Sequence, residues 1–401
     1  MFKLFLNLSI LIIYCLFFIA GSCEKSGLKN SDNSIEIKIE NKDTEITNTE
    51  FLNTNSALIN EINSKKINNI KNDTFNNQIN LLNDYFFIYD KIDAEGGLVK
   101  LPPIKKNLVI GDSSFTIQLI KQYLLKIGDI PVNDNTGIFD SLLLKGIKSI
   151  QFRLGMETTG IISKSLVSEM NIPVKSRVKQ ISINLERFRK FNQHNISNYL
   201  LVNIPEFKLH LFKKNQLQWS MDIIVGKVKN PTAVFENTIQ YVVFSPYWNV
   251  PNSILNNELM PLIRRNRNYI SSHNMEWTAG KLRQRPGADN PLGLIKFLFP
   301  NKYNIYLHDT PMKSLFKSEK RAFSHGCIRI ADAPKLAEYL LKNDTSWNIE
   351  KIRIAMNANI EHYVKLKYPL PILINYFTSW VDEKGLLHFT KDIYKKDIQT
   401  K

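Results

Sequence analysis

Residues able to do covalent and acid–base chemistry gather around position 327. Cys327 lies in the segment RAFSHGCIRI and is the only cysteine after position 23. A cysteine attacks a carbonyl group well only as a thiolate, so a catalytic cysteine needs a nearby base or positive charge. His325 precedes the thiol by two residues and Arg329 follows it by two. Because residues two apart share one face of an extended chain, we expect these side chains to lie together.

A second candidate base stands farther away. His308 ends the apolar, strand-like run NIYLH, which would present its side chain at the end of a strand. Gly326, immediately before the thiol, allows a tight turn that exposes backbone N–H groups, as an oxyanion pocket requires. Arg329 could hold a substrate carboxylate through paired hydrogen bonds. These residues together predict a nucleophilic site at Cys327.

Other interpretations of the same residues are open at this point. A lone buried cysteine is most often structural. A zinc site normally draws on paired ligands at short spacing, which one thiol with dispersed histidines does not supply, so we predict no metal and no cofactor. The histidines with no comparable surroundings, expected at the surface or in strands, are His194, His210, His273, His362 and His388.

Composition narrows the class of protein. The chain has 401 residues, of which 43% are apolar, so it is long enough for two or three globular domains. Its formal net charge is +16, but the basic residues are scattered rather than gathered into one stripe. This argues against nucleic-acid binding, whereas a generally basic surface suits an anionic polymer or a membrane.

The N-terminus reads as an export signal. Lys3 precedes an apolar run from Leu4 to Ala20, and small residues lead up to Cys23. This pattern resembles the bacterial lipobox, in which the cysteine is lipidated, although Ala20 stands where leucine is usual. The alternative is an uncleaved membrane anchor. Both interpretations place the rest of the chain outside the cytoplasm, tethered to a membrane on the periplasmic side of a bacterial cell envelope.

Sequence character changes four times along the chain. After a signal sequence at residues 1–22, a polar, Asn-rich tether spans 23–80. Helical periodicity over 81–180 predicts a helical scaffold. Short β-branched and aromatic runs over 195–345 predict a mostly antiparallel β domain, with a basic helical insert at about 256–285. Residues 346–401 form a C-terminal extension, and the fold class is α+β with several domains.

Local signals mark several helix ends. Asp140 and Ser163 are candidate N-caps of two helices in the scaffold, and Gly128 and Gly155 stand where helices should stop. Asp332 is a candidate N-cap for ADAPKLAEYLLKN in the β domain. The scaffold phrase IQFRLGMETTGIISKSLVSEMN resembles the small peptidoglycan-binding domain, and a plain three-helix scaffold is the alternative.

The pair YLHDTP and SHGCIR resembles the L,D-transpeptidase catalytic domain, in which a histidine on one strand is followed about twenty residues later by a serine-x-glycine-cysteine-x-arginine phrase. The intervening RPGADNPLGLIKFLFPNKYNIYLHDTP is similar to the long form of this family, and YPLPILINYFTSWVDEKGLLHFTKDIY resembles its C-terminal extension. The resemblance covers roughly residues 80 to 397.

The resemblance assigns roles to the site residues. It implies that Cys327 is the nucleophile and His308 the base, with an oxyanion hole at the amides of Gly326 and Cys327. It also implies that the Tyr306 backbone carbonyl orients the imidazole. If His308 forms an ion pair with the thiol, the pKa of Cys327 should lie below the roughly 8.5 of a free cysteine.

The remaining predicted contacts are to substrate. Arg329, Ser324 and His325 are predicted to bind substrate, and His325 is not expected to be the base because part of the family has a small residue there. The partners implied are donor and acceptor tetrapeptide stems of peptidoglycan, joined through a cysteine thioester with release of D-alanine. A cysteine carboxypeptidase or endopeptidase on the same stems, or a non-catalytic wall-binding lipoprotein, are the alternatives.

Overall fold

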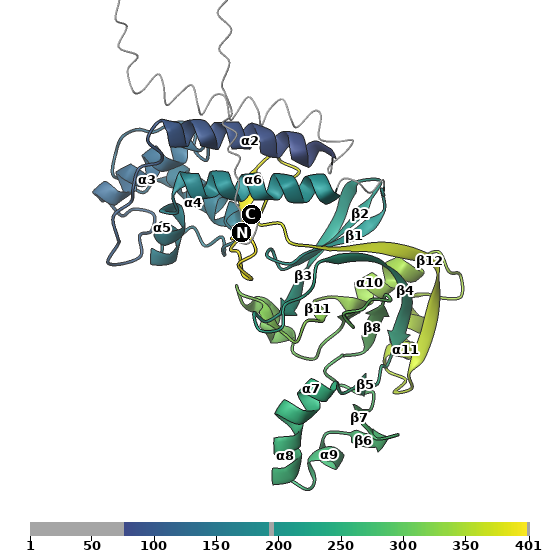
Figure 1. The fold of residues 1–401 in the computed structure, drawn as a ribbon. Helices are drawn as coiled ribbons and strands as arrows, with labels where there is room; N and C mark the ends of the chain where they lie inside the picture. Colours follow the sequence, from purple (N-terminus) through teal and green to yellow (C-terminus); the bar gives the residue numbers. More distant parts are fainter. Residues whose placement is uncertain (1–75, 192–195, 399–401) are drawn as a thin grey trace, which may run out of the picture. The chain divides into compact units, whose positions relative to one another are not determined.

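A computed structural model describes residues 76–191 and 196–398 (Figure 1). The predicted signal sequence, Cys23 and nearly all of the predicted tether lie outside the described residues. Within the described ranges, no helix is both long enough and apolar enough to cross a membrane.

Helices make up the first part of the described chain. They are α2 (Asn76–Ala94), α3 (Phe115–Lys126), α4 (Ser141–Arg153), α5 (Lys164–Met170) and α6 (Val174–Phe191). Their apolar faces pack on one another in a continuous core, which confirms the helical character predicted for this part of the chain.

The predicted helix ends are confirmed. The Asp140 carboxylate accepts a hydrogen bond from the Leu143 amide, and the Ser163 hydroxyl accepts one from the Leu166 amide. After α3 the chain turns at Gly128, which has a φ of 77°, a left-handed conformation that favours glycine.

A nine-stranded sheet forms the centre of the second part. Its order is β10-β3-β11-β9-β8-β4-β12-β1-β2, and a further pairing of β2 with β3 closes the sheet on itself. The strands are β1 (Tyr199–Asn203), β2 (Lys208–Lys213), β3 (Gln216–Gly226), β4 (Phe235–Phe244), β8 (Ile295–Leu298), β9 (Leu307–His308), β10 (Ala322–Ser324), β11 (Ile328–Ile330) and β12 (His362–Asn375). Most pairs are antiparallel, as predicted; the parallel pairs are β1–β12, β9–β11 and β3–β10.

Two helices and a second core support this sheet. α10 (Ala333–Leu341) begins at its predicted N-cap, Asp332, whose carboxylate accepts from the Lys335 amide, and α11 (Ile349–Met356) follows it. Their buried side chains join those of the strands in one apolar cluster. Strand β12, from the predicted extension, lies between β1 and β4 and is therefore integral to the sheet.

The predicted insert folds around a small core of its own (Figure 1). It comprises β5 (Trp248–Asn249), α7 (Asn252–Ile254), a π-helical turn (Leu255–Leu259), α8 (Met260–Arg265), α9 (Tyr269–Ser272), β6 (Met275–Thr278) and β7 (Lys281–Gln284). The core consists of Val250, Leu259, Met275 and Leu282. The insert is thus a separate packing unit rather than a single helix.

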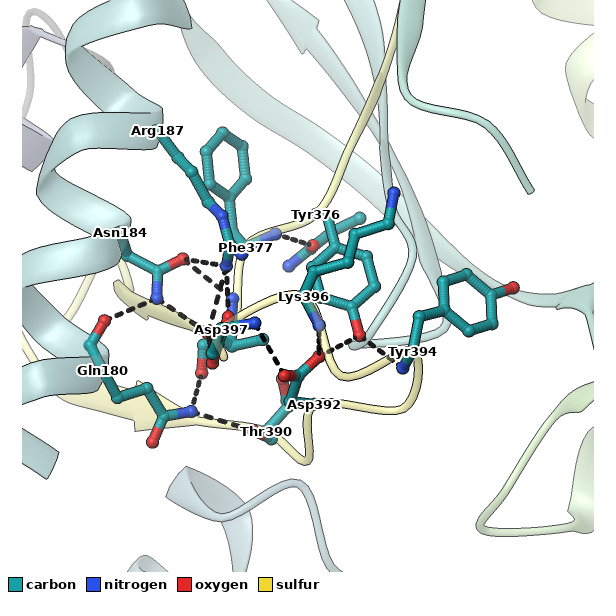
Figure 2. A network of polar contacts seen from close by, with 12 residues as sticks. Gln180, Asn184, Arg187, Tyr376, Phe377, Thr390, Asp392, Tyr394, Lys396 and Asp397 are labelled. Atoms are coloured by element: carbon teal, nitrogen blue, oxygen red, sulfur yellow. Dashed lines mark hydrogen bonds and ion pairs between the residues drawn. The ribbon is translucent and has the colours of Figure 1, made fainter. Parts of the chain in front are cut away.

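The C-terminal segment connects the helices to the sheet. After β12 the chain forms the hairpin β13 (Ser379–Val381) and β14 (Leu387–Phe389). Figure 2 shows that α6 contacts this segment: Gln180 donates to the carbonyls of Thr378 and Thr390, and Arg187 pairs with Asp397 at 2.7 Å. These contacts hold the C-terminal segment against α6.

Candidate active site

The parallel pairing of β9 with β11 brings the predicted nucleophile and base together. Register places His308 opposite Arg329 and Leu307 opposite Ile328, whose amide donates to the Tyr306 carbonyl at 3.1 Å. Cys327 directly precedes β11 and therefore lies beside Tyr306, which hydrogen-bonds to the thiol through its backbone and its side chain. Residues nineteen positions apart thus form one site at the ends of adjacent strands.

The imidazole of His308 is buried, with 4% of its surface exposed. Its Nδ1–H donates to the Asp309 carbonyl oxygen at 2.5 Å. Burial, with the nearby positive charge of Arg329, lowers the pKa of His308 to about 3, so the ring is neutral at pH 7. A neutral ring with its proton on Nδ1 carries its lone pair on Nε2, where it can accept a proton.

Asp309 is a site residue missing from the sequence-based prediction. Its carboxylate accepts from the Leu294 amide at 3.0 Å and from Lys313 Nζ at 2.6 Å. A Cβ at Gly293 would lie 2.4 Å from Asp309 Oδ2, so only glycine permits this close approach. The locked Asp309 backbone in turn orients His308. The position of this aspartate directly after His308 in YLHDTP is the sequence feature from which its role could have been predicted.

The prediction that the Tyr306 carbonyl orients the imidazole is wrong. That oxygen accepts the hydrogen bond from the Ile328 amide on the adjacent strand. The Nδ1–H of His308 donates to the Asp309 carbonyl instead. Tyr306 instead acts on the thiol of Cys327, whose pKa its hydrogen bonds lower. The centroid of its ring lies 5.7 Å from that of His308.

Cys327 is half-buried, and its surroundings act on the pKa of its thiol in opposite directions. Burial raises the pKa of Cys327, and the hydrogen bonds from Tyr306 and the charge of Arg329 only partly oppose this. The Sγ atom contacts the Asn304 carbonyl at 3.6 Å. This direction is opposite to the lowered thiol pKa that we expected from an ion pair with His308.

Ser324 shapes the turn that carries the thiol. It is 2% exposed, and its hydroxyl accepts from the Gly326 amide at 3.0 Å while donating to the Cys327 carbonyl at 2.5 Å. The hydroxyl is buried and engaged in both directions, and the predicted contact of Ser324 with substrate stays a prediction. The Gly326 amide, predicted as an oxyanion donor, is bound by Ser324 in this structure.

His325 does not share a face with Cys327. Gly326 has a φ of 118°, and this turn interrupts the alternation of side chains that an extended chain would have. The Nε2 atom of His325 lies 2.7 Å from Glu258 Oε1 in the insert and 3.2 Å from Lys227 Nζ. His325 therefore faces the insert, and its predicted contact with substrate stays a prediction.

Arg329 is a partly buried cation beside the thiol. Its Nη1 donates to the Met312 sulfur at 3.8 Å, and its buried Nε has no hydrogen-bond partner among the described residues. No carboxylate within 76–191 or 196–398 forms an ion pair with it. A guanidinium without a carboxylate partner in the protein can bind a substrate carboxylate by donating paired hydrogen bonds. In the same ranges, no cluster of three or more His, Cys, Asp or Glu side chains could hold a metal ion.

Comparison with known proteins gives one family match and several partial relatives. Residues 197–354 match the family model for YkuD, the L,D-transpeptidase catalytic domain. A Haemophilus influenzae protein named "Putative L,D-transpeptidase" is 29% identical over 242 residues, which cover 55% of this chain and 48% of that protein. The chain thus spans about half the length of this curated relative.

Solved structures with similarity include an L,D-transpeptidase from Mycobacterium smegmatis and one from Xylanimonas cellulosilytica. The first is 14% identical and covers 45% of this chain and 58% of that chain, with a TM-score of 0.26. The second is 9% identical and covers 68% of this chain and 100% of that chain, with a TM-score of 0.23. Residues 197–354 of this chain are therefore similar to the L,D-transpeptidase catalytic domain.

Proposed function

We propose that this protein is an L,D-transpeptidase that cross-links peptidoglycan stem peptides through a thioester on Cys327. The observation that supports the proposal is the parallel pairing of β9 with β11, in which His308 is opposite Arg329, two residues after Cys327. The imidazole proton of His308 is held on Nδ1 by the Asp309 carbonyl. Within a domain of this family, that arrangement suits cysteine acyl transfer.

The first half-reaction acylates the thiol. The Cys327 sulfur attacks the carbonyl carbon of the bond joining the stem's diamino acid to its terminal D-alanine, and the thiol proton passes to His308 Nε2. The C–N bond then breaks, His308 returns the proton to the departing amine, and D-alanine leaves. The low pKa of His308 makes its protonated form a strong acid for that step.

The second half-reaction transfers the acyl group. An amine of a neighbouring stem attacks the thioester carbonyl and gives its proton to His308, and the thiolate leaves and is reprotonated. The amide of Cys327 stabilises the oxyanion in both half-reactions, since the Gly326 amide already donates to the Ser324 hydroxyl. Arg329 holds a carboxylate of the stem. The insert covers the acyl-enzyme and limits the entry of water, which supports transfer over hydrolysis.

A direct test is the product pattern. The full chain is incubated with purified disaccharide-tetrapeptide, and the products are followed by mass spectrometry. Cross-linked dimers with released D-alanine are the expected result. Monomers shortened by D-alanine, with no dimers, would assign a carboxypeptidase instead. An unchanged substrate would leave a non-catalytic wall-binding protein and would contradict the proposal.

We also propose that the protein is exported and membrane-tethered through a lipid on Cys23, with the helical part acting as a peptidoglycan-binding-like module. Support comes from the sequence patterns described above, which lie partly outside the described residues. Cys23→Ser should leave an unlipidated precursor or release the protein from the membrane fraction. Normal processing and partitioning of that variant would contradict the lipid anchor.

A further inference from the structure

One buried threonine, Thr232, holds the backbone next to the thiol through a hydrogen bond. Thr232 is fully buried, and its hydroxyl accepts a hydrogen bond from the Gly226 amide at 2.9 Å. The single hydroxyl proton is therefore available for the Gly326 carbonyl, to which it donates at 2.8 Å. Thr232 thus links the end of β3 to the residue that precedes Cys327.

This hydrogen bond fixes the direction of the Cys327 amide. The Gly326–Cys327 peptide is trans, since the described chain has no cis peptide bonds. In a planar trans peptide the C=O and the N–H point in opposite directions. With the Gly326 carbonyl aimed at Thr232, the Cys327 N–H points away from it. Among the described residues this N–H has no hydrogen-bond partner.

Close packing leaves this arrangement little freedom. A Cβ at Gly226 would lie 3.1 Å from Gly326 Cα and 2.8 Å from the Thr232 amide nitrogen, so the backbone segments meet without room for a side chain. The peptide plane therefore cannot rotate easily while the threonine hydrogen bond is in place.

The C-terminal segment supports the threonine in turn. The buried Tyr394 hydroxyl donates to the Gly226 carbonyl at 2.5 Å and accepts from the Thr232 amide at 3.3 Å. The Tyr394 amide donates to the Tyr376 hydroxyl, which donates to Asp392 at 2.6 Å (Figure 2). This network reaches from the extension to the peptide beside the thiol.

We propose that Thr232, supported by Tyr394, is a positioning residue that aims the Cys327 N–H at the oxyanion formed during acyl transfer. The proposal rests on the acyl-transfer function proposed above and adds two residues that touch neither the substrate nor the reacting atoms. They keep the Cys327 N–H in place before the reaction. A donor that had to reorient during acyl transfer would slow that step.

The test separates oxyanion stabilisation from thiol reactivity. Thr232→Val keeps the shape of the side chain but removes its hydroxyl. We expect kcat for D-alanine release to fall about tenfold or more with KM within about twofold of wild type. Alkylation of Cys327 by iodoacetamide displaces iodide and forms no oxyanion, so its rate between about pH 5 and pH 10, followed by peptide mass spectrometry, should match wild type.

Three further variants complete the design. Thr232→Ser retains the hydroxyl and should restore most of kcat. Tyr394→Phe should lower kcat in the same way but less. Thr390→Val is the matched control, because Thr390 is a buried threonine of the C-terminal segment whose hydroxyl has no partner among the described residues. It should leave kcat unchanged.

Several outcomes would overturn the proposal. These are a wild-type kcat in Thr232→Val, a failure of Thr232→Ser to restore it, or a parallel loss of alkylation and turnover, which would indicate general damage to the site. Failure of the underlying function looks different. In that case Cys327→Ala would still release D-alanine, or the wild-type protein would not act on the stem at all.

Discussion

The two sides of the Cys327 turn are held in different ways. On the inner side, the buried hydroxyls of Ser324 and Thr232 bind the backbone on both flanks of the thiol, and Tyr394 supports Thr232 by binding the Gly226 carbonyl. On the outer side, His325 meets Glu258 of the insert through a contact between partly exposed side chains. Buried, fully paired hydrogen bonds are costly to break, whereas exposed ion pairs contribute about 0–1 kcal/mol. The contacts on the inner side should therefore cost more free energy to break than the contact on the outer side.

Loss of the thiol itself should have the largest effect. Cys327→Ala should reduce D-alanine release and dimer formation to background, because no other group in the site can form the acyl-enzyme. The change removes little volume, so the free energy of unfolding should stay within about 1 kcal/mol of wild type. Chemical denaturation checks the fold, and turnover above background in a folded variant would contradict the assignment.

Loss of the base should come next. His308→Gln should slow acylation by about 10²–10⁴-fold, the usual contribution of a positioned general base. Single-turnover release of D-alanine measures this step. Near wild-type acylation in the variant would show that another group accepts the thiol proton.

The inner site also predicts an unusual pH profile. A base with a pKa near 6.5 would lose activity below that pH, but the pKa of His308 is about 3, so the neutral, proton-accepting ring persists on acidification. We expect kcat/KM of the free enzyme to show no loss from His308 protonation between about pH 7 and pH 5. The raised pKa of Cys327 places thiolate formation on the alkaline side. An acid limb centred near the ordinary histidine pKa that disappears in His308→Gln would contradict this assignment.

Changes to the outer side should have the smallest effect. His325→Ala and Glu258→Gln should each lower turnover only modestly, within about tenfold, because an exposed pair contributes about 1 kcal/mol or less. The alkylation-versus-pH curve of Cys327 should stay close to wild type in both. A large shift of that curve in His325→Ala, with none in a His308 variant, would make His325 the base.

Local signals in the sequence predicted much of the fold but not the partners of its strands. The caps at Asp140, Ser163 and Asp332 depend on neighbouring residues and are confirmed. Helix α6 is absent from the prediction, although its buried Ile181 and Leu185 follow helical spacing. The central place of β12 depends on pairing with β1, which is about 170 residues away, and periodicity carries no such information.

The same distinction applies to the site. Residue types and spacing made Cys327 and His308 candidates, because their chemistry is intrinsic to their side chains, and the family resemblance supplied their predicted roles. The supporting residues are ordinary ones, such as Thr232 and Asp309, whose roles arise only from packing between distant segments. The assigned orienter, Tyr306, was wrong for this reason: a backbone carbonyl's partner is set by strand register.

The most direct test of the central claim is the identity of the acylated residue. The full chain is mixed with disaccharide-tetrapeptide without an acceptor, quenched in acid at short times, and examined by intact and peptide mass spectrometry. The account predicts an adduct on Cys327 with the mass of the stem lacking D-alanine, absent from Cys327→Ala. An adduct on another residue, or release of D-alanine by Cys327→Ala, would contradict it.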